Sequence, residues 1–110
     1  MSEEWVKVAA LDDLADGTMM VVGVDDEPVC LYNLGGTVYA TQNICTHEEA
    51  SLAEGFIEGD CIECPLHQAL FHIPTGKART APATEDLRIY PVKVEGGQIC
   101  VFAGALGRKP

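Results

Sequence analysis

The stretches Cys45-Thr46-His47 and Cys64-Pro65-Leu66-His67 decide how this chain is interpreted. Each offers one thiolate and one imidazole, and sixteen residues separate His47 from Cys64. Pro65 favours a loop in the second stretch, and loops often carry binding residues. Two cysteines and two histidines in two matched pairs form a set of metal ligands.

The segments around these two stretches are typical of short β-strands. Apolar and β-branched runs bounded by turn residues predict strands over residues 5–9, 18–24, 29–34, 37–40, 61–63, 69–73, 87–94 and 98–102. The pairs Gly35-Gly36 and Gly96-Gly97 predict hairpin turns, and one helical turn is expected within 48–55, ending at Gly55. In the run 87–94, Pro91 indicates an edge or a bulge. The side chains expected to point inward there are Leu87, Ile89, Val92 and Val94.

The predicted fold class is therefore all-β, built of small antiparallel sheets or a sandwich. We expect one domain over residues 1–110, in keeping with its length. The ligand segment, about 43–73, is inserted between an N-terminal meander and a C-terminal hairpin. Two hairpin loops can then converge on one cofactor.

The charge pattern restricts the partners. The formal net charge is −10, and the segment 8–76 has no Lys or Arg but twelve Asp or Glu. Such a surface disfavours nucleic acid and anionic membranes. The charge alone leaves two interpretations open: it favours a basic face of another protein, or it only aids solubility. The acidic start Met1-Ser2-Glu3-Glu4 and the absence of a run of 18 apolar residues predict a soluble, cytoplasmic protein.

The ligand types leave two kinds of metal centre open, zinc and an iron–sulfur cluster. Zinc fingers usually place their cysteines together and their histidines together, whereas each stretch here carries one of each. The odd number of cysteines, five, also disfavours a framework of disulfides and favours metal ligation. In a Rieske centre two histidines replace two cysteines on one iron of a [2Fe–2S] cluster.

The full pattern resembles the Rieske family, because Pro65 follows the third ligand and Thr75-Gly76 follows the second stretch in a β context. The resemblance implies a Rieske fold with a cluster-binding subdomain and one [2Fe–2S] cluster. It also implies that Cys45 and Cys64 hold the buried iron and that His47 and His67 hold the outer one. Residues expected to form a partner-contact rim around the tip are Thr46, Leu66 and Gln68.

With 110 residues, the chain resembles the small Rieske ferredoxins of bacterial aromatic-ring-hydroxylating dioxygenases. The resemblance implies a monomeric one-electron carrier that docks transiently. Its partners would be a flavin-dependent ferredoxin reductase fed by NADH or NADPH and a terminal Rieske non-haem iron oxygenase. The alternatives are a Rieske electron-transfer subunit of another oxidoreductase and a zinc-binding Cys₂His₂ interaction module.

Catalysis by this chain is not expected. A mononuclear non-haem oxygenase iron needs two histidines and a carboxylate, and only His72 remains once His47 and His67 bind the cluster. No Gly-x-Gly-x-x-Gly follows a predicted strand, so a dinucleotide site is not expected.

Departures from the high-potential Rieske pattern predict a low potential. Ala50 and Leu66 stand where those proteins carry a disulfide, and Ala69 and Phe71 stand where they place hydroxyl groups against the cluster. Rieske potentials span about −150 to +300 mV, and fewer hydrogen-bond donors beside acidic residues predict the low end.

The remaining cysteines, Cys30, Cys61 and Cys100, are expected to pack in the core. His72 is expected to have a supporting or surface role.

Overall fold

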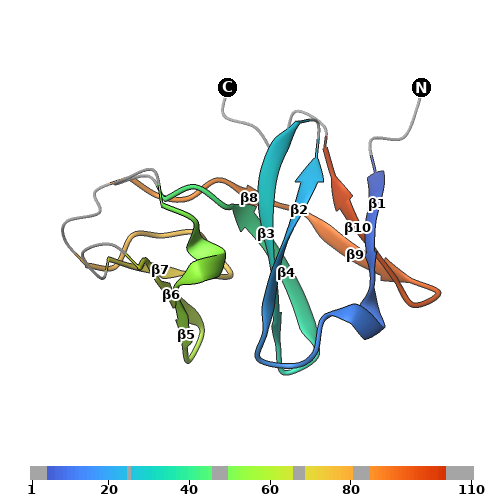
Figure 1. The fold of residues 1–110 in the computed structure, drawn as a ribbon, viewed down its shortest axis with the longest axis horizontal. Helices are drawn as coiled ribbons and strands as arrows, with labels where there is room; N and C mark the ends of the chain where they lie inside the picture. Colours follow the sequence, from blue (N-terminus) through green and yellow to red (C-terminus); the bar gives the residue numbers. More distant parts are fainter. Residues whose placement is uncertain (1–4, 25, 46–49, 66–68, 81–84, 104–110) are drawn as a thin grey trace.

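In the computed structural model, three antiparallel sheets make up the fold (Figure 1). The structure describes residues 5–24, 26–45, 50–65, 69–80 and 85–103. The first sheet contains β1 (Trp5–Ala10), β10 (Gln98–Phe102) and β9 (Val92–Glu95). The second contains β2 (Met19–Val24), β3 (Glu27–Leu34), β4 (Thr37–Gln42) and β8 (Ile89–Tyr90). The third contains β5 (Phe56–Glu58), β6 (Cys61–Glu63) and β7 (Leu70–His72).

Strand β3 lies at the centre of the fold, so its side chains are buried on both faces of the second sheet. The run from Val29 to Asn33 is buried throughout. Since side chains alternate along a strand, Val29 and Leu31 enter one apolar cluster, whereas Cys30 and Tyr32 enter another. The first cluster also contains Ile99 and Val101 of the β1-β10-β9 sheet, and the second contains residues of the third sheet together with Cys45 and Cys64.

The predicted N-terminal meander is confirmed: β2, β3 and β4 pair in order. The C-terminal hairpin is confirmed as β9 and β10. The expected single strand over 87–94 is wrong. Pro91 cannot donate a backbone hydrogen bond, and the chain divides there: β8 pairs with β4, and β9 pairs with β10. As a result Ile89 and Val94 are exposed rather than inward, and Tyr90 is buried.

The third sheet forms a subdomain inserted between β4 and β8 (left side of Figure 1). A single 3-10 turn, η2 (Leu52–Glu54), precedes it and ends at Gly55, whose N–H donates to the Leu52 carbonyl. A second 3-10 turn, η1 (Leu11–Asp13), follows β1. Strand β5 was not predicted from the sequence. It forms a strand because Phe56 and Glu58 pair with β6.

Candidate metal centre

Cys45 and Cys64 each open a loop of the same form. The N–H of Cys45 donates to the carbonyl of Ala50 at 2.9 Å, and the N–H of Cys64 donates to the carbonyl of Ala69 at 2.8 Å. Each bond closes a loop whose ends lie five positions apart. Both cysteines are buried, at 4% and 0% exposure, and both belong to the same apolar cluster. The fold therefore brings together the two thiol groups predicted from the sequence.

The predicted histidine ligands His47 and His67 lie outside the described residues. The same holds for the three rim residues, Thr46, Leu66 and Gln68. Their spacing from the cysteines places them inside the two closed loops, within 46–49 and 65–68. Within the described part of the chain, no three His, Cys, Asp or Glu side chains gather to hold a metal ion.

Asn43 anchors the first loop to the central sheet. Its backbone N–H donates to the Pro28 carbonyl at 3.0 Å, and its own carbonyl accepts from Leu52 at 2.8 Å. Its side chain, buried at 3% exposure, donates to Ser51 Oγ at 2.9 Å and accepts from Ala53 N–H at 3.1 Å. Asn43 was not singled out from the sequence, because its role depends on burial and on bonds to residues eight and ten positions away, which only the structure shows.

Gly55 packs against the start of the second loop. A Cβ at Gly55 would lie 1.9 Å from the Glu63 carbonyl oxygen and 3.2 Å from Cδ of Pro65. Only glycine permits this approach, since non-bonded carbon atoms are optimally separated by about 3.5–4.0 Å. The residue after η2 thus lies against the backbone on either side of Cys64. This contact ties the segment that follows the first loop to the base of the second.

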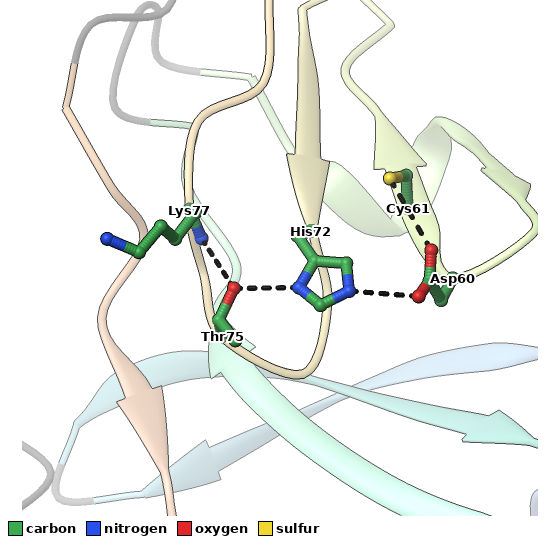
Figure 2. A network of polar contacts seen from close by, with 5 residues as sticks. All are labelled: Asp60, Cys61, His72, Thr75 and Lys77. Atoms are coloured by element: carbon green, nitrogen blue, oxygen red, sulfur yellow. Dashed lines mark hydrogen bonds and ion pairs between the residues drawn. The ribbon is translucent and has the colours of Figure 1, made fainter.

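The far end of the subdomain is held by a network around His72, the residue expected to have a supporting role. Figure 2 shows its imidazole between Thr75 and Asp60. Nδ1 lies 2.7 Å from Thr75 Oγ1, and Nε2 lies 2.9 Å from Asp60 Oδ2. A carboxylate only accepts, so Nε2–H donates to Asp60. The hydrogen bond from His72 lowers the pKa of the exposed Asp60 carboxyl below its ordinary value of 3.8.

Thr75-Gly76, part of the sequence pattern, joins the third sheet to the chain that leads back into β8. Thr75 Oγ1 accepts from Lys77 N–H at 3.3 Å. Gly76 adopts a left-handed conformation (φ +77°), and a Cβ there would lie 2.4 Å from the Leu87 carbonyl oxygen. The Leu87 N–H in turn donates to the Gly76 carbonyl at 2.7 Å. The pair is therefore a structural junction.

The other cysteines divide into one core residue and two half-buried residues. Cys30 is buried as predicted, and burial raises the pKa of its thiol to about 12. The prediction of core packing was wrong for Cys61 and Cys100, which are half-buried. Their strands alternate, so the inward places next to them belong to Ile62 and to Ile99. Cys61 Sγ lies 3.8 Å from Asp60 Oδ1, and burial, followed by the charge of Asp60, raises the pKa of Cys61.

The donor set fits an iron–sulfur cluster. Two thiols lie in an apolar core at the bases of two loops, and each loop carries one histidine in the sequence. Thiolates are the usual ligands of such clusters, and Rieske centres add two histidines. The buried Ala69 and Phe71 line the same core without a hydroxyl group. Ala50, in that core too, has no thiol, so the disulfide of high-potential relatives cannot form.

Comparison with known proteins agrees with this geometry. The model of the Rieske [2Fe-2S] domain matches residues 4–91, so the chain belongs to the Rieske [2Fe–2S] family. It carries one cluster of the Rieske type.

The curated relatives are ferredoxin components of dioxygenase systems. The chain is 44% identical to the ferredoxin component of naphthalene 1,2-dioxygenase/salicylate 5-hydroxylase systems of a Ralstonia species, over 90% of this chain and 95% of that protein. It is 43% identical to the ferredoxin component of the naphthalene 1,2-dioxygenase system of Pseudomonas aeruginosa, over 92% and 97%. These relatives are electron-transfer components, which confirms that this chain is not the catalytic one.

Solved structures give the same fold. The ferredoxin of carbazole 1,9a-dioxygenase from Nocardioides aromaticivorans IC177 matches with a TM-score of 0.87 and 37% identity, over 91% of this chain and 98% of that one. A ferredoxin solved with the reduced oxygenase of carbazole 1,9a-dioxygenase matches with a TM-score of 0.86 and 39% identity, over 93% and 95%. In the part of the chain that the structure describes, no helix has the length and apolar character needed to cross a membrane.

Proposed function

We propose that this protein carries single electrons from an NADH- or NADPH-dependent flavin reductase to the terminal oxygenase of an aromatic-ring-hydroxylating dioxygenase. One observation carries the proposal. A ferredoxin that is 39% identical and matches 93% of this chain was solved in complex with such an oxygenase component. The curated ferredoxin components of naphthalene dioxygenase systems support the same role.

The proposed ligands are Cys45 and Cys64 on one iron and His47 and His67 on the other. Support comes from the burial of both cysteines in one apolar cluster and from the matching hydrogen bonds that close their loops. When bound, the cluster accepts and releases one electron at a time. The chain's own residues close the two loops at their bases and exclude water from the thiolates.

Docking of the partners is proposed to be brief and electrostatically guided. Redox encounters bury less than about 1,200 Å² in total. The segment 8–76, which contains both ligand loops, has twelve acidic residues and no Lys or Arg, so basic patches on the partners would be attracted. We propose that Thr46, Leu66 and Gln68 form the contact rim, and that the whole chain acts as one monomeric domain in the cytoplasm.

Spectroscopy of the purified protein tests the cofactor and its ligands. We expect iron and sulfide in equal amounts, two of each per chain, and a Rieske signal by EPR after reduction. His47→Ala and His67→Ala should each abolish that signal, whereas His72→Asn, at the histidine bonded to Thr75 and Asp60, should keep it. Colourless protein containing zinc would overturn the proposal.

Reconstitution tests the function. The probe is the purified terminal oxygenase of a naphthalene 1,2-dioxygenase system with its reductase and NADH. Substrate oxidation should require this protein, and its apparent KM should rise with ionic strength, because screening weakens attraction between charged surfaces. An oxygenase that stays oxidised when this reduced ferredoxin is added would overturn the proposed function.

A further inference from the structure

The third sheet has one face in the core and one face in solvent. Its register aligns Ile57, Ile62 and Phe71 in one row across the three strands, and all three pack in the apolar cluster that holds the ligand cysteines. Since paired residues point to the same side of a sheet, the neighbouring rows point the other way. These outward rows are Phe56, Glu63 and Leu70, and Glu58, Cys61 and His72.

Phe56 is the most exposed of the large apolar side chains in the described residues, at 67%. It begins β5, the outer strand of the sheet in the order β5-β6-β7. Burying such a side chain against a partner is favourable, because its apolar surface is removed from water. An aromatic ring held on a short strand can therefore contribute binding energy to another protein at little entropic cost.

Phe56 also lies beside the second ligand loop. It pairs with Glu63, the residue before Cys64. The preceding Gly55 approaches both the Glu63 carbonyl and Pro65, the first residue inside that loop. A partner seated on Phe56 would therefore adjoin the loop that carries His67.

Acidic residues lie close to Phe56 in the sequence and across the strand pair. Glu54 and Glu58 are exposed, and Glu63 is half-buried across the strand pair. Arg79 lies beside β7, at the opposite edge of this sheet, where its backbone N–H donates to the Leu70 carbonyl at 2.7 Å. The complementary surface is an apolar pocket rimmed by Lys or Arg on the side that meets β5.

We propose that the outer face of β5, with Phe56 as its anchor and Glu54, Glu58 and Glu63 as its rim, docks the terminal oxygenase. The inference rests on the proposed function, in which that oxygenase receives the electron. The oxygenase is chosen over the reductase because a related ferredoxin has been solved in complex with an oxygenase component. The face extends the contact area beyond the loop tips and gives the encounter an orientation.

Phe56→Ser tests the anchor. In the naphthalene oxygenase assay it should raise the apparent KM for ferredoxin about tenfold, the effect of losing a moderate interface aromatic. Reduction by the reductase, measured separately with cytochrome c as acceptor, should stay within about twofold of wild type. Glu58→Lys should also raise the oxygenase KM and should weaken its dependence on salt.

Two controls separate docking from damage. Val94→Ser removes an exposed apolar side chain, 42% exposed, from the β1-β10-β9 sheet on the other side of the molecule (Figure 1) and should leave both assays unchanged. The EPR signal and cluster content of Phe56→Ser should equal those of wild type.

The other possible results separate the docking face, the choice of partner and the proposed function. An unchanged oxygenase KM in Phe56→Ser, with wild type active, overturns the docking face and leaves the proposed function intact. A rise confined to the reductase assay overturns the choice of partner. A wild-type protein that cannot reduce the oxygenase overturns the proposed function and this inference with it.

Discussion

The side-chain amide of Asn43 lies 2.9 Å from the hydroxyl oxygen of Ser51, and this bond spans the first ligand loop from one end to the other. Asn43 precedes the loop, and Ser51 follows Ala50, the residue that closes it. The amide oxygen also accepts from Ala53 N–H at 3.1 Å. The buried Asn43 side chain thus holds the chain together beyond the end of β4.

Asn43→Ala should therefore destabilise the metal centre more than the sheets. Leaving the half-buried Ser51 hydroxyl and Ala53 N–H without their partner should cost about 1 kcal/mol of unfolding free energy, the lower end of the range for a lost hydrogen-bond partner. Purified Asn43→Ala should contain less than half of the wild-type iron and should lose its visible absorption faster on warming.

Asn33→Ala is the matched control. Asn33 is also buried and also bonds twice through its side chain, to the Leu14 carbonyl and to Gly36 N–H, but on the far side of the central sheet. It should lower the melting temperature with a normal iron content. Equal iron loss in both variants would contradict the local role of Asn43.

Gly55→Ala should displace the second ligand loop. Its Cβ would lie 1.9 Å from the Glu63 carbonyl oxygen, so the backbone before Cys64 must shift. Overpacking of this kind costs about 1–3 kcal/mol or more. We expect weak or absent cluster incorporation, measured as iron per chain. Gly23→Ala, in β2 with open space around the position, should bind iron normally. Full iron in Gly55→Ala would show that the loops adjust freely.

How far the sequence predicts this structure depends on the element. The meander and the C-terminal hairpin were predictable because alternation and paired glycines act locally. The assignment of the residues on either side of Pro91 to two different sheets was not predictable, since periodicity cannot tell which sheet a strand joins. Ile89 and Val94 are exposed as a result. Strand β5 was missed because only three residues lie in it, between Gly55 and Gly59, and it forms by pairing with β6.

For the candidate metal centre, the spacing of the two matched Cys and His pairs singled out Cys45 and Cys64, which the structure places in one apolar cluster. The residues that support the two loops could not be identified from the sequence. Asn43 and Gly55 act through contacts with partners eight to ten residues away, and a single sequence does not show which loop residue makes such a contact. The half-buried positions of Cys61 and Cys100 follow from strand register, which residue type does not reveal.

The reduction potential is predicted to lie at the low end of the range of about −150 to +300 mV. The apolar core beside the ligand cysteines offers Ala69 and Phe71 where a hydroxyl would stabilise the reduced cluster. A redox titration followed by visible absorption should give a clearly negative value. Phe71→Tyr should raise it if the spectrum shows an intact cluster, and Tyr39→Phe, at a residue packed on the outside of this core, should not. A positive wild-type potential would contradict the prediction.

The bond between Asp60 and His72 should make the acid stability of the protein depend on Asp60. The folded-state pKa of this carboxyl is lowered below 3.8, chiefly by the hydrogen bond from His72. A carboxyl with a lowered folded-state pKa contributes stability that is present above its unfolded pKa and is lost as pH falls through the folded value. The difference in unfolding free energy between wild type and Asp60→Asn should therefore be constant above about pH 5 and should shrink below pH 3.8. Denaturant titrations at several pH values measure it, with Asp12→Asn, at an exposed position on η1, as the control. A difference that stays constant down to about pH 2 would show that the Asp60–His72 bond does not couple folding to protonation of Asp60.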